Sequence, residues 1–227
     1  PESLYWNPAG LGGVERRIVS FTHNEWLEDI RYEYLGFAIG LPSLGGFGVS
    51  AGRLDAGKLE GRNEQGEPTG DFGASDMVVS LGYGRDLWPF LAVGAGGNYV
   101  TSKLDNETAA TFAASAGVLA RPVSGLSLGV AVANAGGEMK FVEEGDPLPL
   151  ALRGGAAYVL PVGGENNRFT LAAAAVKFND ADLRYQTGAE YVFMNAVAAR
   201  GGYKIGYDQD GVTAGLGVMY SPAENVP

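Results

Sequence analysis

The chain has 227 residues, of which 46% are hydrophobic, only 19% are charged and 36 are Gly. Because each Gly in a helix interior costs about 1 kcal/mol, this composition disfavours a mostly helical protein, and the lack of a Gly-X-Y period excludes collagen. With no Cys and one His, the sequence excludes a disulfide scaffold, a thiol enzyme, a Cys-ligated metal site and a His-based metal cluster within one chain. The formal charge of −10 has the wrong sign for a nucleic-acid binder. We therefore expect no cofactor, no metal ion and no nucleic-acid partner.

No Ser- or Pro-rich linker and no change in composition divides the chain, so we expect one domain over residues 1–227. The longest purely aliphatic run, residues 171–176, is far shorter than the roughly 20 residues of a membrane-spanning helix. The opening Pro1-Glu-Ser-Leu lacks the basic and apolar regions of a signal peptide, which indicates a mature or trimmed chain. Within the domain we distinguish an entry segment (1–14), a region of strands (15–220) and a final turn (221–227).

About twelve segments of eight to twelve residues alternate large side chains with small or polar ones, which is the period of a β-strand. The clearest is 126–134, where Leu126, Leu128 and Val130 alternate with Ser127 and Gly129. A soluble β-sandwich would fill its inner face with Leu, Ile and Val, whereas here the second face carries Gly, Ala, Ser and scattered charge. The alternation predicts strands with one bulky face and one nearly bare face.

The connections between these segments alternate in length. Longer or more polar ones (24–29, 55–72, 103–108, 136–147, 179–182 and 206–211) alternate with tight turns (42–46, 84–89, 121–125, 161–164, 194–195 and 221–222). Aromatic residues gather near the segment ends, as in the interfacial girdles of membrane barrels. We therefore predict an all-β fold: an antiparallel, up-and-down transmembrane β-barrel with short periplasmic turns and long external loops.

The segment Asn7-Pro8-Ala9-Gly10-Leu11, followed soon by the first strand, resembles the N-terminal motif of the FadL-like outer-membrane proteins, and more closely that of their PorV/PorQ group. Segments 21–30, 148–158, 199–207 and 213–217 are also similar to that group, in the same order. The resemblance covers essentially the whole chain and implies a barrel of about 14 strands in the outer membrane of a Gram-negative-type bacterium. About 12 are visible here, so the resemblance also implies that a C-terminal hairpin is missing.

The resemblance implies a non-enzymatic outer-membrane component of protein export, of the type IX secretion kind, that binds cargo or a translocon. The alternative is a FadL-like transporter of fatty acids or other hydrophobic small molecules, and a third class is a structural or adhesin barrel. The entry segment is shorter than the N-terminal hatch of a FadL-type transporter, which favours the export role. The expected partners are outer-membrane lipid together with secreted proteins, a translocon or a hydrophobic ligand.

Four motifs that suggest other chemistry have a simpler explanation. His23 has no Ser at the spacing that outer-membrane hydrolases use, so we expect no enzymatic activity. Residues 179–182 and 208–211 carry closely spaced carboxylates but lack the distal bidentate Glu of a calcium loop, and we interpret them as turns. The Gly-rich stretch 94–97 lies inside a strand pattern with no helix after it, so it is not a phosphate-binding loop.

The candidate site residues fall into two groups. In the motif, we expect the Asn7 side chain to bond the backbone of the entry segment, Pro8 to fix the turn and Ala9 to fit where a larger side chain cannot. The second group is a set of charges assigned to the face opposite the bulky one, which would be the lumen of a barrel. They either pair across strands or line a polar path: Arg31, Glu33, Arg184, Glu190, Arg200 and Lys204.

Overall fold

The computed structural model describes residues 1–26, 29–141, 145–164, 166–207 and 211–219. The chain begins with a single helical turn, α1 (Ser3–Trp6), and a 3₁₀ helix, η1 (Pro8–Gly13), and the elements that the structure describes after them are β-strands. The predicted turn 221–227 lies outside the described residues. The expectation of an all-β fold is confirmed.

Twelve strands form one antiparallel sheet in which each strand pairs with the next sheet strand along the chain, and a separate hairpin is inserted between the seventh and eighth of them. The sheet strands are β1 (Arg17–Glu25), β2 (Arg31–Leu41), β3 (Gly45–Arg62), β4 (Pro68–Trp88), β5 (Leu91–Leu104), β6 (Glu107–Ala120), β7 (Leu126–Ala135), β10 (Ala151–Pro161), β11 (Arg168–Phe178), β12 (Arg184–Phe193), β13 (Val197–Ile205) and β14 (Val212–Val218); the inserted hairpin is β8 (Glu138–Lys140) and β9 (Gly145–Pro147).

The two faces of the sheet differ because side chains alternate along every strand. Large apolar residues occupy the convex face, where they remain exposed: Leu81 is 65% exposed, Phe112 72% and Val130 68%. Small residues occupy the other face, and several of these are fully buried, including Ala38 and Ala92. A monomeric soluble protein rarely exposes an apolar surface larger than a few hundred Å². We call this exposed surface the apolar belt; it includes Leu35, Phe37, Val49, Val79, Leu81, Tyr99, Phe112, Val130, Leu152, Leu171, Tyr191 and Leu216.

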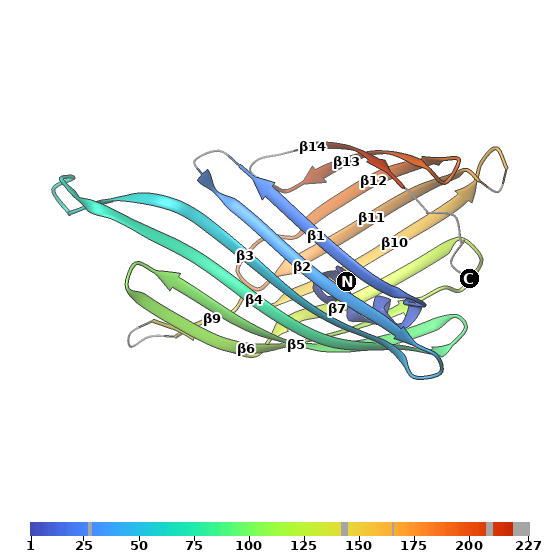
Figure 1. Cartoon of the computed structure of the whole chain (residues 1–227), viewed down its shortest axis with the longest axis horizontal. Helices are drawn as coiled ribbons and strands as arrows, with labels where there is room; N and C mark the ends of the chain where they lie inside the picture. Colours follow the sequence, from blue (N-terminus) through green and yellow to red (C-terminus); the bar gives the residue numbers. More distant parts are fainter. Residues whose placement is uncertain (27–28, 142–144, 165, 208–210, 220–227) are drawn as a thin grey trace, which may run out of the picture.

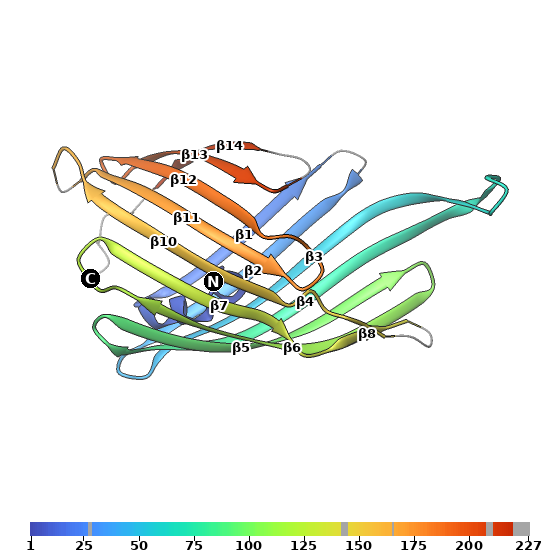
Figure 2. The same cartoon turned by 180° about the vertical axis from the view of Figure 1, so that it is seen from behind.

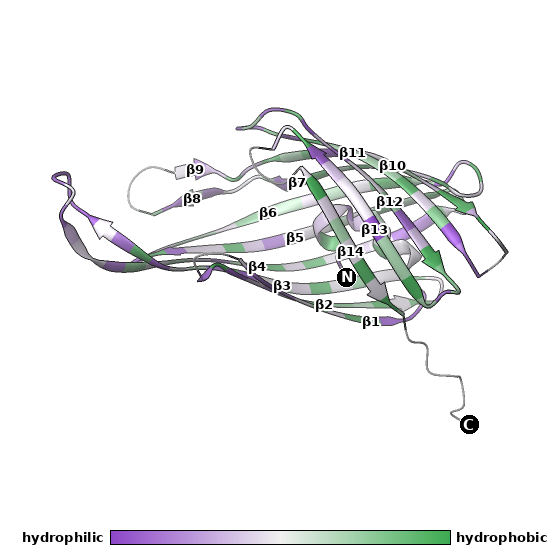
Figure 3. Ribbon diagram, turned by 90° about the horizontal axis from the view of Figure 1, so that it is seen from above, coloured by the Kyte–Doolittle hydropathy of each residue, from purple (hydrophilic) through white to green (hydrophobic). Residues whose placement is uncertain are grey.

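The sheet curls around the N-terminal segment. In opposite views α1 and η1 lie between the front strands and the back strands (Figures 1 and 2), and the view from above shows them enclosed on the concave side (Figure 3). In the strand order β1 and β14 are the two outer strands, and no pairing joins them among the residues that the structure describes. The fold is therefore a strongly curved 12-stranded sheet with its N-terminus inside.

The hairpin of β3 and β4 extends well beyond its neighbours (Figure 1). The pairing with β2 ends at Asp55 and the pairing with β5 ends at Ala74, but β3 and β4 continue to pair with each other as far as Arg62 and Pro68. The prediction of a loop over 55–72 is therefore wrong. The abundant Gly and charge in this stretch suggested a loop, whereas successive residues pair across the two strands, as Leu59 does with Phe72 and Glu60 with Asp71. We call residues 56–73 the arm.

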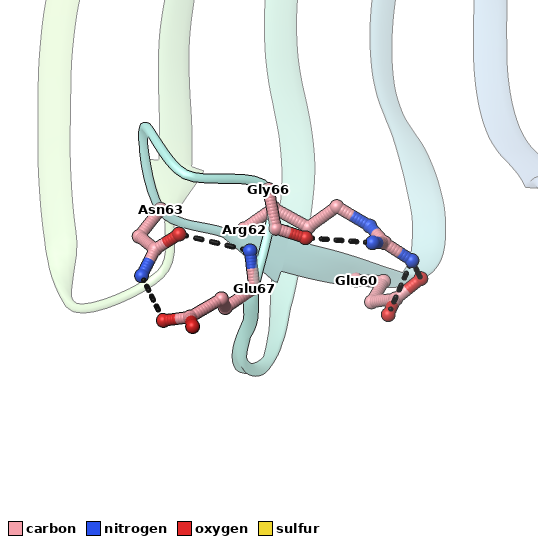
Figure 4. Close-up of polar contacts among 5 residues, drawn as sticks. All are labelled: Glu60, Arg62, Asn63, Gly66 and Glu67. Atoms are coloured by element: carbon pink, nitrogen blue, oxygen red, sulfur yellow. Dashed lines mark hydrogen bonds and ion pairs between the residues drawn. The ribbon is translucent and has the colours of Figure 1, made fainter.

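A polar network fixes the tip of the arm (Figure 4). Arg62 donates one hydrogen bond to the carbonyl of Gly66 (2.8 Å) and others to the Glu60 carboxylate (2.9 and 3.0 Å). Asn63 Oδ1 accepts from the backbone N–H groups of Gln65 and Glu67, and its Nδ2 donates to the Glu67 carboxylate. The side chains thus provide the bonds that neighbouring strands provide elsewhere, and the arm keeps its shape beyond the sheet.

Other predicted connections are also shorter than expected. Residues 103–108 belong mostly to β5 and β6, which join through a turn at Asp105 and Asn106, and 136–147 contains the β8–β9 hairpin. Residues 84–88 belong to β4, so the turn predicted there is confined to Pro89 and Phe90. The tight turn predicted at Met194 and Asn195 is present but also includes Ala196, because Phe193 and Val197 are register partners; Met194 and Asn195 have positive φ angles of 51° and 52°.

Candidate functional site

The entry segment forms a plug, comprising α1, Asn7 and η1, on the concave side of the sheet. The Asn7 side chain accepts a hydrogen bond from the backbone N–H of Ala9 (3.0 Å), which caps η1, and Pro8 follows at the first position of that helix. Proline is suited to this position because its ring fixes φ and it has no N–H to satisfy. The structure thus places Asn7 and Pro8 in the local roles expected from the motif.

Asn7 also binds the wall of the sheet, which the sequence did not indicate. Its Nδ2 donates to the carbonyl oxygens of Val118 in β6 (3.0 Å) and Val130 in β7 (3.2 Å). These two residues are register partners, so a single amide bridges two adjacent strands. One side chain therefore caps the plug and attaches it to the sheet.

The wall of the sheet approaches the plug so closely that only Gly fits. A Cβ atom added at Gly94 would lie less than 3.0 Å from the backbone of Pro8 and Ala9, and one at Gly117 would overlap the Asn7 side chain. Ala9 and Leu11 are completely buried against this wall. The inward Gly residues of β2–β6 therefore admit the backbone of the plug, and the fit of Ala9 agrees with its place in the motif. Other wall positions where an added Cβ would meet backbone of the entry segment are Gly40, Gly46 and Gly84.

Arg153 in β10, the strand that pairs with β7, also contacts the plug. Its guanidinium donates to the carbonyl of Tyr5 and lies over the rings of Tyr5 (4.4 Å) and Trp6 (5.5 Å). A cation over an aromatic face is attracted by the ring quadrupole, which fixes the two rings relative to β10. Sequence reasoning missed this residue, although an isolated Arg in the small-residue strand Ala151–Pro161 was a signal available to it.

Beyond Tyr5 and Trp6 the concave side contains a cavity of about 1120 Å³, bounded by β7 and β10–β14. Small inward residues form much of its wall, among them Ala157, Ala172, Ala174 and Gly188. Its described lining includes four basic side chains and one acidic one: Arg153, Arg184, Arg200, Lys204 and Glu190. The cavity therefore combines a largely apolar wall with an excess of positive charge, the composition expected of a site for an apolar molecule carrying an anionic group.

Four predicted lumen charges lie in this cavity. Arg200 and Glu190 are register partners on β13 and β12, and Arg200 Nε lies 2.6 Å from Glu190 Oε2. Arg184 and Lys204 lie near the Tyr207 ring, at 4.9 Å and 5.7 Å from its centroid. Gln186 of β12 donates a hydrogen bond to the Tyr207 hydroxyl (2.5 Å), so the Tyr207 ring is held by side chains of β12 and β13.

The other two predicted lumen charges, Arg31 and Glu33, do not face the cavity, and that prediction is wrong. They occupy the same face of β2 as the exposed Leu35 and Phe37, while Tyr34 on the opposite face is buried. Arg31 pairs with Glu25 (3.4 Å), and His23 lies 3.6 Å from Glu33. The assumption that charge always faces inward fails here because β2 continues beyond the apolar belt, where outward positions become polar.

No helix of the described residues has the length and apolar character needed to cross a membrane. Among the same residues no group of three or more His, Cys, Asp or Glu side chains could hold a metal ion. Residues 208–210 of the second carboxylate-rich motif lie outside the described residues, and Asp180 of the first lies in a turn.

No protein-family model matches the chain. A search of curated proteins also finds no match. The function therefore has to be argued from the plug, the cavity and the exposed belt themselves.

Proposed function

We propose that the chain is a non-enzymatic outer-membrane β-barrel protein whose N-terminal plug blocks the lumen on one side and leaves a ligand site on the other. The apolar belt supports the membrane location, because such residues are stable at the surface when they face lipid. A transmembrane barrel alternates apolar residues on its lipid face with polar residues on its inner face, and here the outward residues are large and apolar while the inward ones are small or polar, such as Ser50, Ser80 and Asn98. In this proposal the arm is at the external end and the tight turns are at the periplasmic end.

Within that frame, the cavity favours transport of a hydrophobic small molecule, as in the FadL-like alternative. A molecule with an apolar chain would contact the wall formed by Ala157, Ala172 and Ala174, and its anionic group would lie near Arg184 and Lys204. The plug argues against an open diffusion pore, because Asn7 attaches it to β6 and β7 and Arg153 attaches it to the adjacent strand β10.

Filling the cavity tests this proposal. Ala174 lines the cavity on β11, whereas Leu171 on the same strand belongs to the apolar belt on the convex face and is outside the lining. We expect Ala174→Trp to abolish binding of oleate, used as a probe, and Leu171→Trp to leave it unchanged, as measured by mass spectrometry of the purified protein. Unchanged binding in Ala174→Trp, with both variants still inserted in the membrane, would refute a ligand site in this cavity.

A second candidate function, a component of protein export that binds cargo or a translocon, is favoured by the arm. A hairpin held by its own hydrogen bonds beyond the sheet offers a preformed polar surface to another protein. Replacing residues 59–72 with Asn-Gly would remove the arm and leave the register of the sheet intact. If the variant lost co-purifying secreted proteins and kept oleate binding, the result would support the export function. If it kept both, the arm would have no role in export.

A further inference from the structure

A small cleft of about 240 Å³ lies at the root of the arm, away from the plug and the large cavity. Its lining includes Arg53 and Asp55 of β3, Ser75 of β4, Lys103 at the end of β5 and Asp105 in the following turn. Asp55 pairs with Ser75, and Ser75 pairs with Lys103, so one row across three adjacent strands forms the centre of the cleft.

The cleft faces the convex side and borders the apolar belt. Beyond Ser75 and Lys103, the next register pair on the same face of β4 and β5 is Met77 and Thr101, and the pair after that is Val79 and Tyr99. Val79 and Tyr99 belong to the apolar belt. Alternation places all of these on the face that carries the cleft. If the belt contacts the acyl chains of a leaflet, the cleft lies at the depth of the headgroups.

Hydrogen bonds fix the shape of the cleft. The backbone N–H of Asp105 donates to the carbonyl of Gly73 (2.9 Å), and Asp105 has a φ of 54°, which sets the tight turn after Lys103. Arg53 is oriented by its hydrogen bond to Asp55 (2.9 Å). Among the described residues Lys103 has no ion pair within 4.0 Å, so its ammonium group is available to a ligand.

The charges of the cleft indicate the kind of headgroup it fits. Arg53 and Lys103 provide donors for a phosphate, and Arg is well suited to this because its guanidinium can form two parallel bonds. Asp105 and Asp55 would repel a bare phosphate, but they accept hydrogen bonds from hydroxyl groups. A phosphorylated sugar carries both kinds of group next to each other.

We propose that this cleft binds the phosphorylated sugar headgroup of a membrane glycolipid, with the acyl chains lying on Met77, Val79 and Tyr99. The inference rests on the proposed function, because it requires the belt to lie in a bilayer with the arm on the external side. Arg53 and Lys103 bind the phosphate, and Asp105 and Ser75 bond the sugar hydroxyls. A soluble phosphate would use the cations alone and would gain nothing from the adjoining belt.

Native mass spectrometry of the purified chain in detergent tests this, with lipid A and dephosphorylated lipid A as probes. We expect the wild type to retain one lipid A and to bind the dephosphorylated form roughly tenfold more weakly, because charge-assisted hydrogen bonds are lost. The double variant Arg53→Ala/Lys103→Ala should lose a similar factor for lipid A and little for the dephosphorylated form. Lys177→Ala provides the control: this Lys lies on the convex face of β11, where it donates to Ala181.

Two outcomes would overturn the inference. One is equal retention of the two probes by the wild type; the other is equal retention of lipid A by the double variant and Lys177→Ala. Heat-modifiable electrophoretic mobility and extraction from reconstituted vesicles report membrane insertion separately. A double variant that inserts normally but retains lipid A removes the cleft and leaves the proposed function intact, whereas a wild type that does not insert removes both.

Discussion

The two halves of the concave face are built from similar small residues but differ in what they enclose. Over β2–β6 the inward positions at the plug are Gly, and the backbone of Pro8 and Ala9 lies directly against the wall. Over β10–β12 many inward positions are Ala, and together with Arg153, Arg184 and their neighbours they surround a cavity. Gly permits contact between backbones, whereas Ala with occasional long polar side chains leaves space. The same side-chain alternation therefore builds two different halves. We call β2–β6 the filled half and β7 with β10–β14 the hollow half.

Adding a single methyl group to each half should have the largest and most unequal effect. In Gly94→Ala the new Cβ meets the backbone of Pro8 and Ala9, which cannot rotate away, and overpacking of this kind costs about 3 kcal/mol. In Gly215→Ala, on β14 in the hollow half, the nearest atom is 4.0 Å away, and we expect a change of about 0.5 kcal/mol or less. Denaturant unfolding in detergent measures both. Similar losses would show that the plug does not pack on this wall as described.

Changes at Asn7 should have the next largest effect, because they weaken the attachment of the plug to the wall of the sheet. Asn7→Ala removes the cap of η1 and both bonds to Val118 and Val130, which we expect to cost about 2 kcal/mol of docking free energy. Asn7→Asp separates these roles, because it keeps the acceptor for Ala9 but loses the donor and places a carboxylate near two carbonyl oxygens. Cleavage by trypsin after Arg16 and Arg17 reports release of the plug.

We expect cleavage in Asn7→Asp to be at least as fast as in Asn7→Ala, because the bonds to the wall contribute more than the cap. If Asn7→Asp resembled the wild type, the cap would be the important contact and the bridge between β6 and β7 would be incidental. Localisation and oleate binding of Asn7→Ala at normal abundance would also show whether the motif matters for function.

On the hollow side Arg153 should contribute less, because it contacts the plug through one hydrogen bond and two rings. We expect Arg153→Lys to lose about 1 kcal/mol of docking free energy, since Lys keeps the charge but not the planar group that stacks on Tyr5. Fluorescence of Trp6, in a background with Trp26 and Trp88 replaced by Phe, reports the change. An unchanged spectrum would mean that the filled half alone positions α1.

The filled half was the more predictable from sequence, and the reason is physical. Alternation of large and small residues along each strand is a local property, and it predicted the antiparallel all-β fold and the bare inner face. The Asn-Pro-Ala sequence predicted a side-chain hydrogen bond to the backbone of the entry segment and a turn, which are also local. The bonds from Asn7 to Val118 and Val130 cross more than 110 residues, and no local pattern encodes which carbonyl groups an amide meets.

The hollow half and the strand ends were less predictable. Arg184, Glu190, Arg200 and Lys204 were assigned to one face by their alternation with aromatic residues, but the cavity between them depends on how the sheet curls. Arg31 and Glu33 were assigned to the wrong face, because the position where a strand leaves the apolar belt is set by tertiary structure. The arm was missed for a related reason: its Gly and charge resemble those of a loop, and the pairing of β3 with β4 overrides that local preference.

The smallest expected effect concerns the pH dependence of plug docking. A hydrogen bond from the Ser20 hydroxyl lowers the pKa of Glu2 below its ordinary value of 4.5, although partial burial opposes this. A carboxyl whose pKa is lowered by folding stabilises the folded state above its ordinary pKa and loses that contribution as the pH falls through the lowered value. Docking should therefore weaken slightly below pH 4.5, and the exposure of Glu2 keeps the effect small. Ser20→Ala returns the pKa of Glu2 toward its ordinary value, so tryptic release measured after a brief acid pulse should become less dependent on pH. If the variant and the wild type responded equally, the acid sensitivity would arise outside the contact between Ser20 and Glu2. The hydrogen bond from β1 would then not help to hold the plug in place.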